Sequence, residues 1–226
     1  MSAGRVKKPR LILFDLDGTL VDSVPDLAFC IDGMMTRIGR PAWGESRVRE
    51  WVGNGVERLV KRALTGQLEG EPDATDYQQA LPLFMDLYSR HNGQQSRLYP
   101  GVKAALKRLK QAGYTLACVT NKAEQFTLPL LQALGIHDCF SLITSGDSLA
   151  RKKPDPLPLL HSAEHFGLSP TESLMVGDSS NDVKAARAAG FAIVCVPYGY
   201  NHGVDIRASS PDAVIDSLER LEAVFT

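Results

Sequence analysis

The stretch Leu11-Ile12-Leu13-Phe14-Asp15-Leu16-Asp17-Gly18-Thr19 joins a run of consecutive apolar residues to two acidic residues and a glycine. Consecutive apolar residues are typical of a strand that is buried on both faces, as in a parallel sheet covered by helices on its two sides. Gly18 permits a sharp change of chain direction after the strand. The stretch therefore predicts a strand at 11–14 whose carboxyl end carries Asp15 and Asp17.

Four further short runs of aliphatic residues predict strands at 115–119, 142–144, 174–176 and 192–196. Helical patterns lie between them, at 101–112, 124–134, 157–166 and 183–189. Each of these helices is followed by a glycine, which adopts the left-handed backbone of a helix end at little steric cost. This alternation predicts an α/β fold with a Rossmann-like parallel sheet as its core.

The stretch from Ser23 to Gly93 contains no convincing strand and has the pattern of several helices, most clearly at 25–38, 56–64 and 77–90. A connection of this length is too long to be one ordinary crossover between strands. We therefore predict an inserted all-helical cap domain at 23–93. The α/β core domain would then consist of 1–22 and 94–226.

Charge is nearly balanced, with 25 lysines and arginines against 26 aspartates and glutamates and a net charge of -1. No overall basic field is present to attract nucleic acid or an anionic membrane. The apolar run at 11–14 is too short for a signal-peptide core or a membrane span. The four cysteines are scattered, as in a reduced protein. We therefore expect a cytoplasmic monomer or small homo-oligomer that binds neither nucleic acid nor membrane.

Asp15 and Asp17 are the first candidate catalytic residues. Open α/β sheets place their ligands at the carboxyl ends of the strands, and residues separated by one position can face the same side of an extended chain. One carboxylate can then attack phosphorus while the other protonates the leaving oxygen. The alternative is an ordinary turn, which aspartate and glycine also favour.

Two further predicted strands are followed by residues that suit a phosphate group. Thr120 and Asn121 follow 115–119 and supply a hydroxyl and an amide, although a threonine at this place can instead cap the next helix. Lys153 precedes Pro154 in the loop after 142–144, and the residue before a proline is conformationally restricted. This lysine can neutralise a phosphate and a nearby carboxylate, although the alternative is a solvated run of charges.

Asp178 and Asp182 follow the predicted strand 174–176 in the stretch Gly177-Asp178-Ser179-Ser180-Asn181-Asp182. Carboxylate oxygens suit Mg²⁺, which usually takes one or two protein carboxylates together with substrate phosphate and water. Asp182 can instead be the N-cap of the following helix. The pattern favours a magnesium site at this strand end.

Four elements thus follow the predicted strands in order along the chain: Asp15-x-Asp17, Thr120, Lys153 and Gly177-Asp178-x-x-x-Asp182. They resemble the motifs of the haloacid dehalogenase superfamily of aspartate-nucleophile phosphohydrolases, and the helical insert lies where the first cap type of that family is inserted. Phosphoryl transfer needs mainly positioning and neutralisation of the charge on the equatorial oxygens. The resemblance implies that Asp182 orients Lys153 or a metal-bound water.

The resemblance also implies a role for each of the other residues. Asp15 would be the nucleophile and a Mg²⁺ ligand. Asp17 would be the general acid and base and would ligate the metal through its backbone carbonyl. Thr120 and Lys153 would hold the phosphoryl group, and Asp178 would complete the metal site.

Within the superfamily, the chain is most similar to bacterial phosphoglycolate phosphatases, through the stretch 14–23 and the segment Trp51-Val52-Gly53-Asn54-Gly55. The similarity implies a magnesium-dependent phosphomonoester hydrolase that acts on a small phosphorylated metabolite and converts 2-phosphoglycolate to glycolate and phosphate. A phosphatase for another small sugar or amino-sugar phosphate and a sugar phosphomutase remain alternatives. Asp17 argues against a dehalogenase, whose leaving halide needs no proton. A non-catalytic protein on this fold would have lost a member of the set.

The segment Gly53-Asn54-Gly55 is the candidate for substrate selection by the insert. Two glycines around one amide residue permit a backbone that comes close to a ligand, although a turn at the start of the helix 56–64 is the alternative. If the substrate carries a carboxylate, it needs a donor, and Arg58 is the candidate for a charge-assisted contact with it. The expected substrate-binding residues are therefore Gly53, Asn54, Gly55 and Arg58 of the insert with Thr120, Asn121 and Lys153 of the core.

Overall fold

The computed structural model describes residues 5–226, and its centre is a sheet of six parallel strands. The strands lie in the order β5-β4-β1-β6-β7-β8, so that the first strand is flanked by two strands from much later in the chain. Their bounds are β1 Leu11–Phe14, β4 Thr115–Val119, β5 Leu142–Thr144, β6 Ser173–Gly177, β7 Ala192–Cys195 and β8 Ala213–Val214. The parallel order confirms the predicted α/β core.

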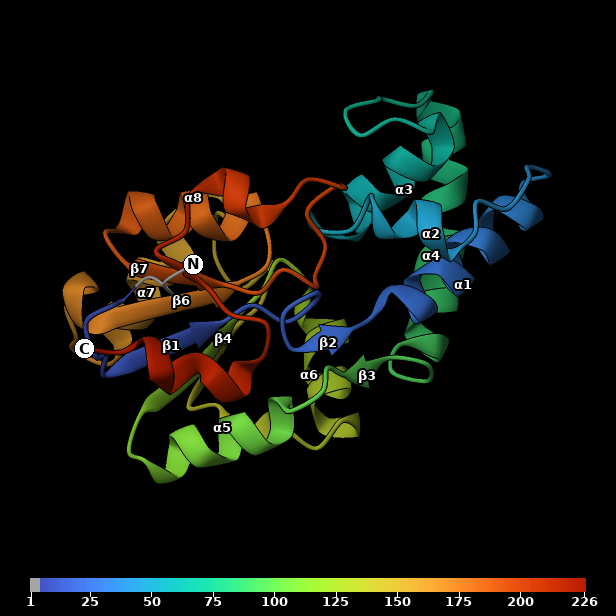
Figure 1. The fold of residues 1–226 in the computed structure, drawn as a ribbon. Helices are drawn as coiled ribbons and strands as arrows, with labels where there is room; N and C mark the ends of the chain where they lie inside the picture. Colours follow the sequence, from blue (N-terminus) through green and yellow to red (C-terminus); the bar gives the residue numbers. More distant parts are fainter. Residues whose placement is uncertain (1–4) are drawn as a thin grey trace.

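Helices cover both faces of this sheet (Figure 1). Ile12 and Phe14 of β1 pack on one face with α5 (Val102–Gln111) and α6 (Glu124–Ala133). Leu11 and Leu13 pack on the opposite face with α7 (Leu157–His165) and α8 (Ser180–Ala189). Burial of both side-chain rows explains why the strands are continuously apolar in sequence.

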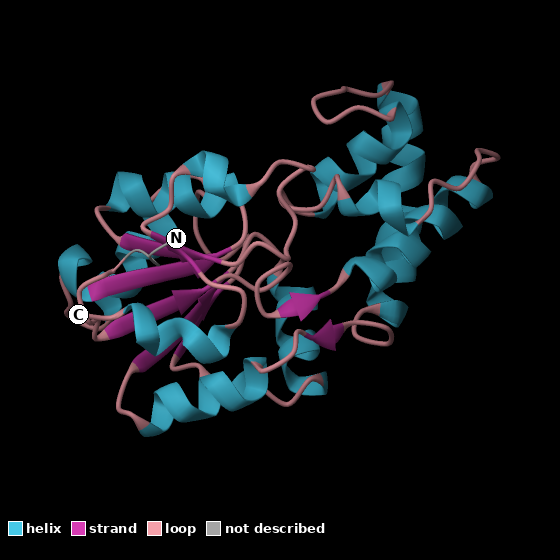
Figure 2. Ribbon diagram, in the orientation of Figure 1, coloured by secondary structure: helices cyan, strands magenta, loops and turns pink. Residues whose placement is uncertain are grey.

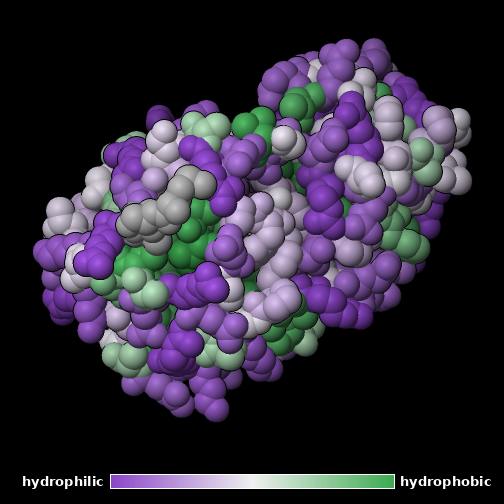
Figure 3. Space-filling model, in the orientation of Figure 1, coloured by the Kyte–Doolittle hydropathy of each residue, from purple (hydrophilic) through white to green (hydrophobic). Residues whose placement is uncertain are grey.

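Four helices form a separate lobe beyond the carboxyl ends of the strands (Figure 2). They are α1 Val24–Arg37, α2 Glu45–Arg49, α3 Val56–Thr65 and α4 Ala74–His91. The lobe has its own buried core, which includes Trp51, Phe84 and Tyr88. A notch in the molecular outline separates it from the sheet, and the surface seen here is mostly hydrophilic (Figure 3).

Two short antiparallel strands lie where the chain enters and leaves this lobe. Val21 of β2 (Val21–Asp22) pairs with Leu98 of β3 (Arg97–Leu98). Between these strands the described chain is helical or irregular, as expected for an all-helical insert. The fold class predicted from the sequence is therefore confirmed.

The remaining elements are short. They are the 3₁₀ turns η1 His137–Cys139, η2 Pro170–Glu172, η3 Ile206–Ser209 and η4 Leu218–Val224. These turns, α2 and the two-residue strands were missed by the sequence prediction because such lengths do not establish a periodic pattern. Within residues 5–226, no helix combines the length and apolarity that are needed to cross a membrane.

Candidate active site

Three neighbouring strands bring three of the predicted site residues to one edge of the sheet. Asp15 follows β1, Thr120 follows β4 and Asp178 follows β6. Phe14 is in register with Cys118 and Val176, so the parallel strands end side by side. The side chains of these three residues therefore meet at the edge that faces the helical lobe.

Lys153 is a buried cation between two carboxylates. Its side chain is 1% exposed, and its Nζ lies 2.9 Å from Asp15 Oδ1 and 2.7 Å from Asp182 Oδ1. Asp182 Oδ2 in turn accepts hydrogen bonds from the Ser179 hydroxyl at 2.7 Å and from the Ser179 backbone N–H at 3.0 Å. Ser179, not Asp182, is thus the N-cap of α8. Asp182 is the third helical residue, and it holds the ammonium against Asp15.

The acidic residues also form a compact oxygen cluster. One carboxylate oxygen each from Asp15, Asp178 and Asp182 lies within 4.8 Å of the others. Burial raises the pKa of Asp15 to about 7 against the opposing charge of Lys153, and Asp182 adds to the rise. Burial likewise raises the pKa of Asp178 well above its ordinary value, and the charges of Asp182 and Asp15 raise it further. Carboxylates that repel one another in this way form a good site for a hard divalent cation.

Asp178 is fixed by two hydrogen bonds within the core. Its Oδ1 accepts from the Thr19 hydroxyl and its Oδ2 from the Tyr200 backbone N–H, both at 2.6 Å. Gly18 and Gly199 lie so close to this carboxylate that an added Cβ at either position would come within 2.3 Å of its Oδ2. The glycine of the Asp-x-Asp-Gly stretch is therefore required by packing as well as by its φ of +88°.

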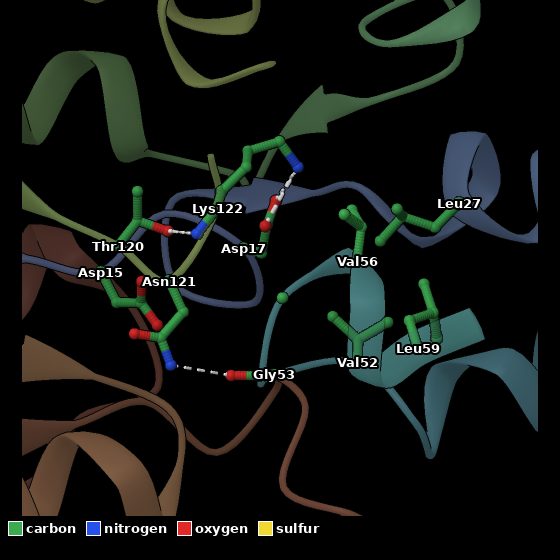
Figure 4. A pocket seen from close by; sticks show the side chains of 11 residues that line it. Asp15, Asp17, Leu27, Val52, Gly53, Val56, Leu59, Thr120, Asn121 and Lys122 are labelled. Carbon is green, nitrogen blue, oxygen red and sulfur yellow. Dashed lines mark hydrogen bonds and ion pairs between the residues drawn. The ribbon is translucent and has the colours of Figure 1, made fainter. Parts of the chain in front are cut away.

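A cavity lies between this edge of the sheet and the helical lobe (Figure 4). The space between the two walls is roughly 430 Å³ when the solvent at its open mouth is included. Its polar wall belongs to the core and consists of Asp15, Asp17, Thr120, Asn121 and Lys122. Its other wall belongs to the insert and consists of Leu27, Val52, Gly53, Gly55, Val56 and Leu59. The insert thus faces the polar and charged side chains of the core with apolar side chains and with the backbone of two glycines.

The haloacid dehalogenase-like hydrolase family has a model that matches residues 12–196. This chain belongs to that family. Curated relatives include phosphoglycolate phosphatases from Nitrosococcus oceani, 62% identical over 98% of each chain, and from Thiobacillus denitrificans, 48% identical over 96% of each chain. The crystal structure of a predicted phosphoglycolate phosphatase from Haemophilus somnus 129pt has a TM-score of 0.90 and 41% identity, covering 95% of this chain and 97% of that chain. The resemblance predicted from the motifs is confirmed.

In this haloacid dehalogenase-like hydrolase, Thr120 does not cap the following helix. Helix α6 begins at Glu124 with Ala123 as its N-cap. The Thr120 hydroxyl oxygen instead accepts a hydrogen bond from the Lys122 backbone N–H at 3.2 Å, and the side chain is buried at the cavity. The structure therefore brings Thr120 to the predicted place.

The glycine loop of the insert approaches the core closely. The carbonyl oxygen of Gly53 accepts a hydrogen bond from the Asn121 side-chain amide at 3.1 Å and another from the Asn181 amide at 3.4 Å. Gly53 and Gly55 have φ values of +138° and +87°, which favour glycine. Asn54 turns away, because its Oδ1 accepts from Arg62 at 2.8 Å. The loop is both a close approach to the core and the start of α3.

The structure does not bring Arg58 to the cavity, so its predicted contact with substrate is corrected here. Its guanidinium pairs with Glu69 at 2.8 Å and with Glu71 at 2.6 Å, and it also donates to the carbonyl oxygen of Leu68. The side chain of Arg58 thus faces the loop between α3 and α4. It ties that loop to α3 and does not line the cavity.

Lys122 is a cavity residue to which the sequence analysis gave no role. Its side chain is 2% exposed, and its Nζ lies 3.1 Å from each carboxylate oxygen of Asp17. It also donates to the Tyr88 hydroxyl at 2.5 Å. Burial alone would lower the pKa of Lys122, but Asp17 and Tyr88 outweigh it and hold the pKa above its ordinary value. The signal in the sequence was its place two residues after Thr120, at the same strand end.

Proposed function

We propose that this enzyme hydrolyses 2-phosphoglycolate to glycolate and phosphate through a phosphorylated Asp15. The observation that carries the proposal is the buried ion pair of Lys153 with Asp15, 2.9 Å apart, in which Asp15 lines the cavity. Such a pair offers a carboxylate nucleophile beside a cation that neutralises phosphate, as phosphoryl transfer requires. The choice of phosphoglycolate is supported by its place in the names of relatives that match almost the whole chain.

We further propose that the enzyme uses Mg²⁺, held by Asp15, Asp178 and the backbone carbonyl of Asp17. The donor set fits the ion, since the available groups are oxygens and the pKa values of both carboxylates are raised. Asp182 belongs to the same oxygen cluster but is engaged by Lys153 and Ser179. When bound, the ion would neutralise charge on the phosphate oxygens and on the two carboxylates.

The first step forms a bond between a carboxylate oxygen of Asp15 and phosphorus. The bond between phosphorus and the bridging oxygen breaks, and that oxygen leaves with the electron pair. Asp17 gives its proton to this oxygen, so that glycolate departs as an alcohol. Lys153 and the Thr120 hydroxyl stabilise the oxygens of the phosphoryl group during the transfer.

The second step returns the enzyme to its starting state. Asp17, now a carboxylate, takes a proton from a water molecule, and the water oxygen attacks phosphorus. The bond between phosphorus and Asp15 breaks, and phosphate is released. Each Asp17 proton that leaves with glycolate is therefore replaced by one from water.

We propose that residues 23–93 act as a cap domain on a core of residues 1–22 and 94–226. The first boundary directly follows β2 and the second lies shortly before β3, and these two strands pair with each other. The insert closes the cavity with Val52, Val56 and Leu59, which would exclude water from the reacting phosphate. Selection of a small ester would follow from the limited space left under this wall.

Phosphate release from a panel of small esters tests the proposal. We expect 2-phosphoglycolate to have the highest kcat/KM, activity to disappear in excess EDTA and to return with Mg²⁺, and Asp15→Asn to be inactive. Activity of Asp15→Asn within about tenfold of the parent, a barrier change of only ~1.4 kcal/mol, would overturn the covalent mechanism. A higher kcat/KM for a sugar or amino-sugar phosphate would identify that ester as the substrate instead of 2-phosphoglycolate. Transfer of phosphate to a sugar instead of water would indicate a mutase.

A further inference from the structure

Lys122 makes the polar contacts to the Asp17 carboxylate. Its ammonium lies 3.1 Å from both Oδ1 and Oδ2 of Asp17. Within residues 5–226, no other side chain and no backbone N–H donates a hydrogen bond to this carboxylate. The Asp17 side chain is 16% exposed, and the Lys122 side chain is 2% exposed. The orientation of Asp17 in the cavity therefore depends on one buried cation.

The third contact of Lys122 comes from the helical insert. Tyr88 lies on α4, and its hydroxyl accepts from Lys122 Nζ at 2.5 Å. Its ring is fully buried and packs against Phe126 of the core, with ring centroids 4.6 Å apart. Lys122 also lies over the Tyr88 ring, 5.0 Å from its centroid. One helix of the insert thus contacts the same cation that contacts Asp17.

These contacts use the full donor capacity of Lys122. An ammonium group has three N–H donors, and the two Asp17 oxygens and the Tyr88 hydroxyl account for three acceptors. Nothing remains to donate to a substrate carboxylate without breaking a contact to Asp17 or Tyr88. Lys122 is therefore placed to act on Asp17 and not on the substrate.

We propose that Lys122 is a positioning residue that holds Asp17 in line for proton transfer, and that Tyr88 holds Lys122, so that Asp17 is aligned only while α4 is docked on the core. The proposal rests on the proposed function, because it requires Asp17 to move a proton. It couples closure of the insert to the chemical step: displacement of α4 removes the hydroxyl that restrains Lys122, and the restraint on Asp17 is lost with it. A displacement of about 1 Å in such a group can lower a rate by about 100-fold.

The test compares esters whose leaving groups differ in their need for a proton. p-Nitrophenyl phosphate leaves without protonation, whereas ethyl phosphate and 2-phosphoglycolate need it, and of these two only 2-phosphoglycolate carries a carboxylate. kcat/KM reports the steps up to departure of the leaving group. We expect Lys122→Met to lower kcat/KM by about 100-fold for ethyl phosphate and 2-phosphoglycolate and by less than about tenfold for p-nitrophenyl phosphate.

Tyr88→Phe keeps the buried ring and removes only the hydroxyl, so it tests the proposal if Lys122→Met does not fold. We expect a smaller loss with the same dependence on the leaving group. Lys107→Met on the exposed face of α5 and Tyr77→Phe on α4 are the matched controls, and neither residue lines the cavity. We expect both controls to match the parent on all three esters.

A double-mutant cycle with Asp17→Asn, assayed on ethyl phosphate, completes the test. If Lys122 acts through Asp17, Lys122→Met will cost little further activity once Asp17 is replaced. Equal losses on all three esters, or the same loss with and without Asp17, would reduce Lys122 to a structural residue and overturn the proposal. A loss on 2-phosphoglycolate alone would make it a carboxylate contact and would also overturn the proposal. Failure of the proposed function can be distinguished from failure of this proposal, because the parent itself would then not hydrolyse these esters or would not need Asp17.

Discussion

The side-chain amide of Asn121 donates a hydrogen bond to the carbonyl oxygen of Gly53, at 3.1 Å, and so joins the end of β4 to the loop before α3. The same amide nitrogen donates to the carbonyl oxygen of Lys153 at 2.9 Å. Asn181, at the start of α8, makes a longer contact with Gly53 at 3.4 Å. One amide therefore connects the insert to the loop that carries the buried lysine.

Replacement of Asn121 by alanine will therefore loosen the docked insert. We expect Asn121→Ala to lower kcat/KM for 2-phosphoglycolate by about tenfold, since the lost hydrogen bonds are worth roughly 1 kcal/mol each. Asn181→Ala will have a smaller effect, because its contact is longer. The exposed residue Gln132 of α6 supplies the control Gln132→Ala. Steady-state kinetics equal to those of the control would show that the Asn121 contact does not hold the insert.

The two adjacent lysines of the loop before Pro154 will behave differently. Lys153 is buried between Asp15 and Asp182, whereas Lys152 is exposed and lies beside Gly55. We expect Lys153→Ala to lower kcat by at least about 100-fold, because it removes the cation proposed to stabilise the phosphoryl group. Lys152→Ala will change kcat by about twofold or less, as surface substitutions do. Equal losses in the two variants would show that the functional lysine has been misassigned.

The strand ends could be predicted from the sequence because a parallel sheet brings them to one edge. Asp15, Thr120 and Asp178 meet for that reason, although they are far apart in the chain. The glycines that follow the helices were equally informative about where the helices end. Gly190, for example, is the C-cap of α8 and has a left-handed φ of 75°. The periodicity of apolar residues and the presence of turn-forming residues are local features, so both can be recognised within a few consecutive positions of the sequence.

The contacts of long side chains could not be predicted in the same way. Arg58 was expected at the cavity, but Glu69 and Glu71 fold back beside it, and no pattern in the sequence determines the path of that loop. Lys122 meets Asp17 across 105 positions and Tyr88 across 34. Such pairs form only after distant segments of the chain have packed together, so propensity and spacing do not reveal them.

The stability of the metal-free enzyme will depend on pH through the acidic cluster. The pKa of Asp15 is raised from 3.8 to about 7, mainly by burial. A carboxyl group with a higher pKa in the folded protein binds its proton more tightly there, so the free energy of unfolding falls as pH rises through this window. We expect Asp15→Asn to raise the Tm of the metal-free protein at about pH 8 but not at about pH 5, where Asp15 is already protonated.

Magnesium will act in the same direction as this substitution. At a concentration of 100 times its Kd, a ligand of the folded state adds about 2.7 kcal/mol to the free energy of unfolding. We expect Mg²⁺ to raise the Tm of the parent more at about pH 8 than at about pH 5, because Asp15 is charged at the higher pH and protonated at the lower one. Thermal unfolding at the two pH values, with and without Mg²⁺, measures this. An effect of Mg²⁺ that is equal at both pH values would place the ion elsewhere.

Substitution of Gly55 separates backbone strain from contact with the core. A Cβ at Gly55 would lie 3.2 Å from Lys152 Nζ and 3.4 Å from the backbone oxygen of Asn121, at a φ of +87°. Gly39 has a similar φ of +75° and nothing within 4 Å of an added Cβ, so Gly39→Ala carries the strain without the contact. We expect both alanine variants to lose about 1 kcal/mol of stability, but only Gly55→Ala to lower kcat/KM, by about tenfold.

Arg58→Ala completes this comparison on the same helix. Arg58 faces Glu69 and Glu71 instead of the cavity, so we expect its kcat/KM on 2-phosphoglycolate to stay within about twofold of the parent. Assays of both variants on 2-phosphoglycolate and on p-nitrophenyl phosphate distinguish loop position from carboxylate binding. A loss in Arg58→Ala confined to 2-phosphoglycolate would show that this arginine leaves the two glutamates to bind substrate. A loss in Gly55→Ala no larger than in Gly39→Ala would show that the close approach to Asn121 has no part in catalysis.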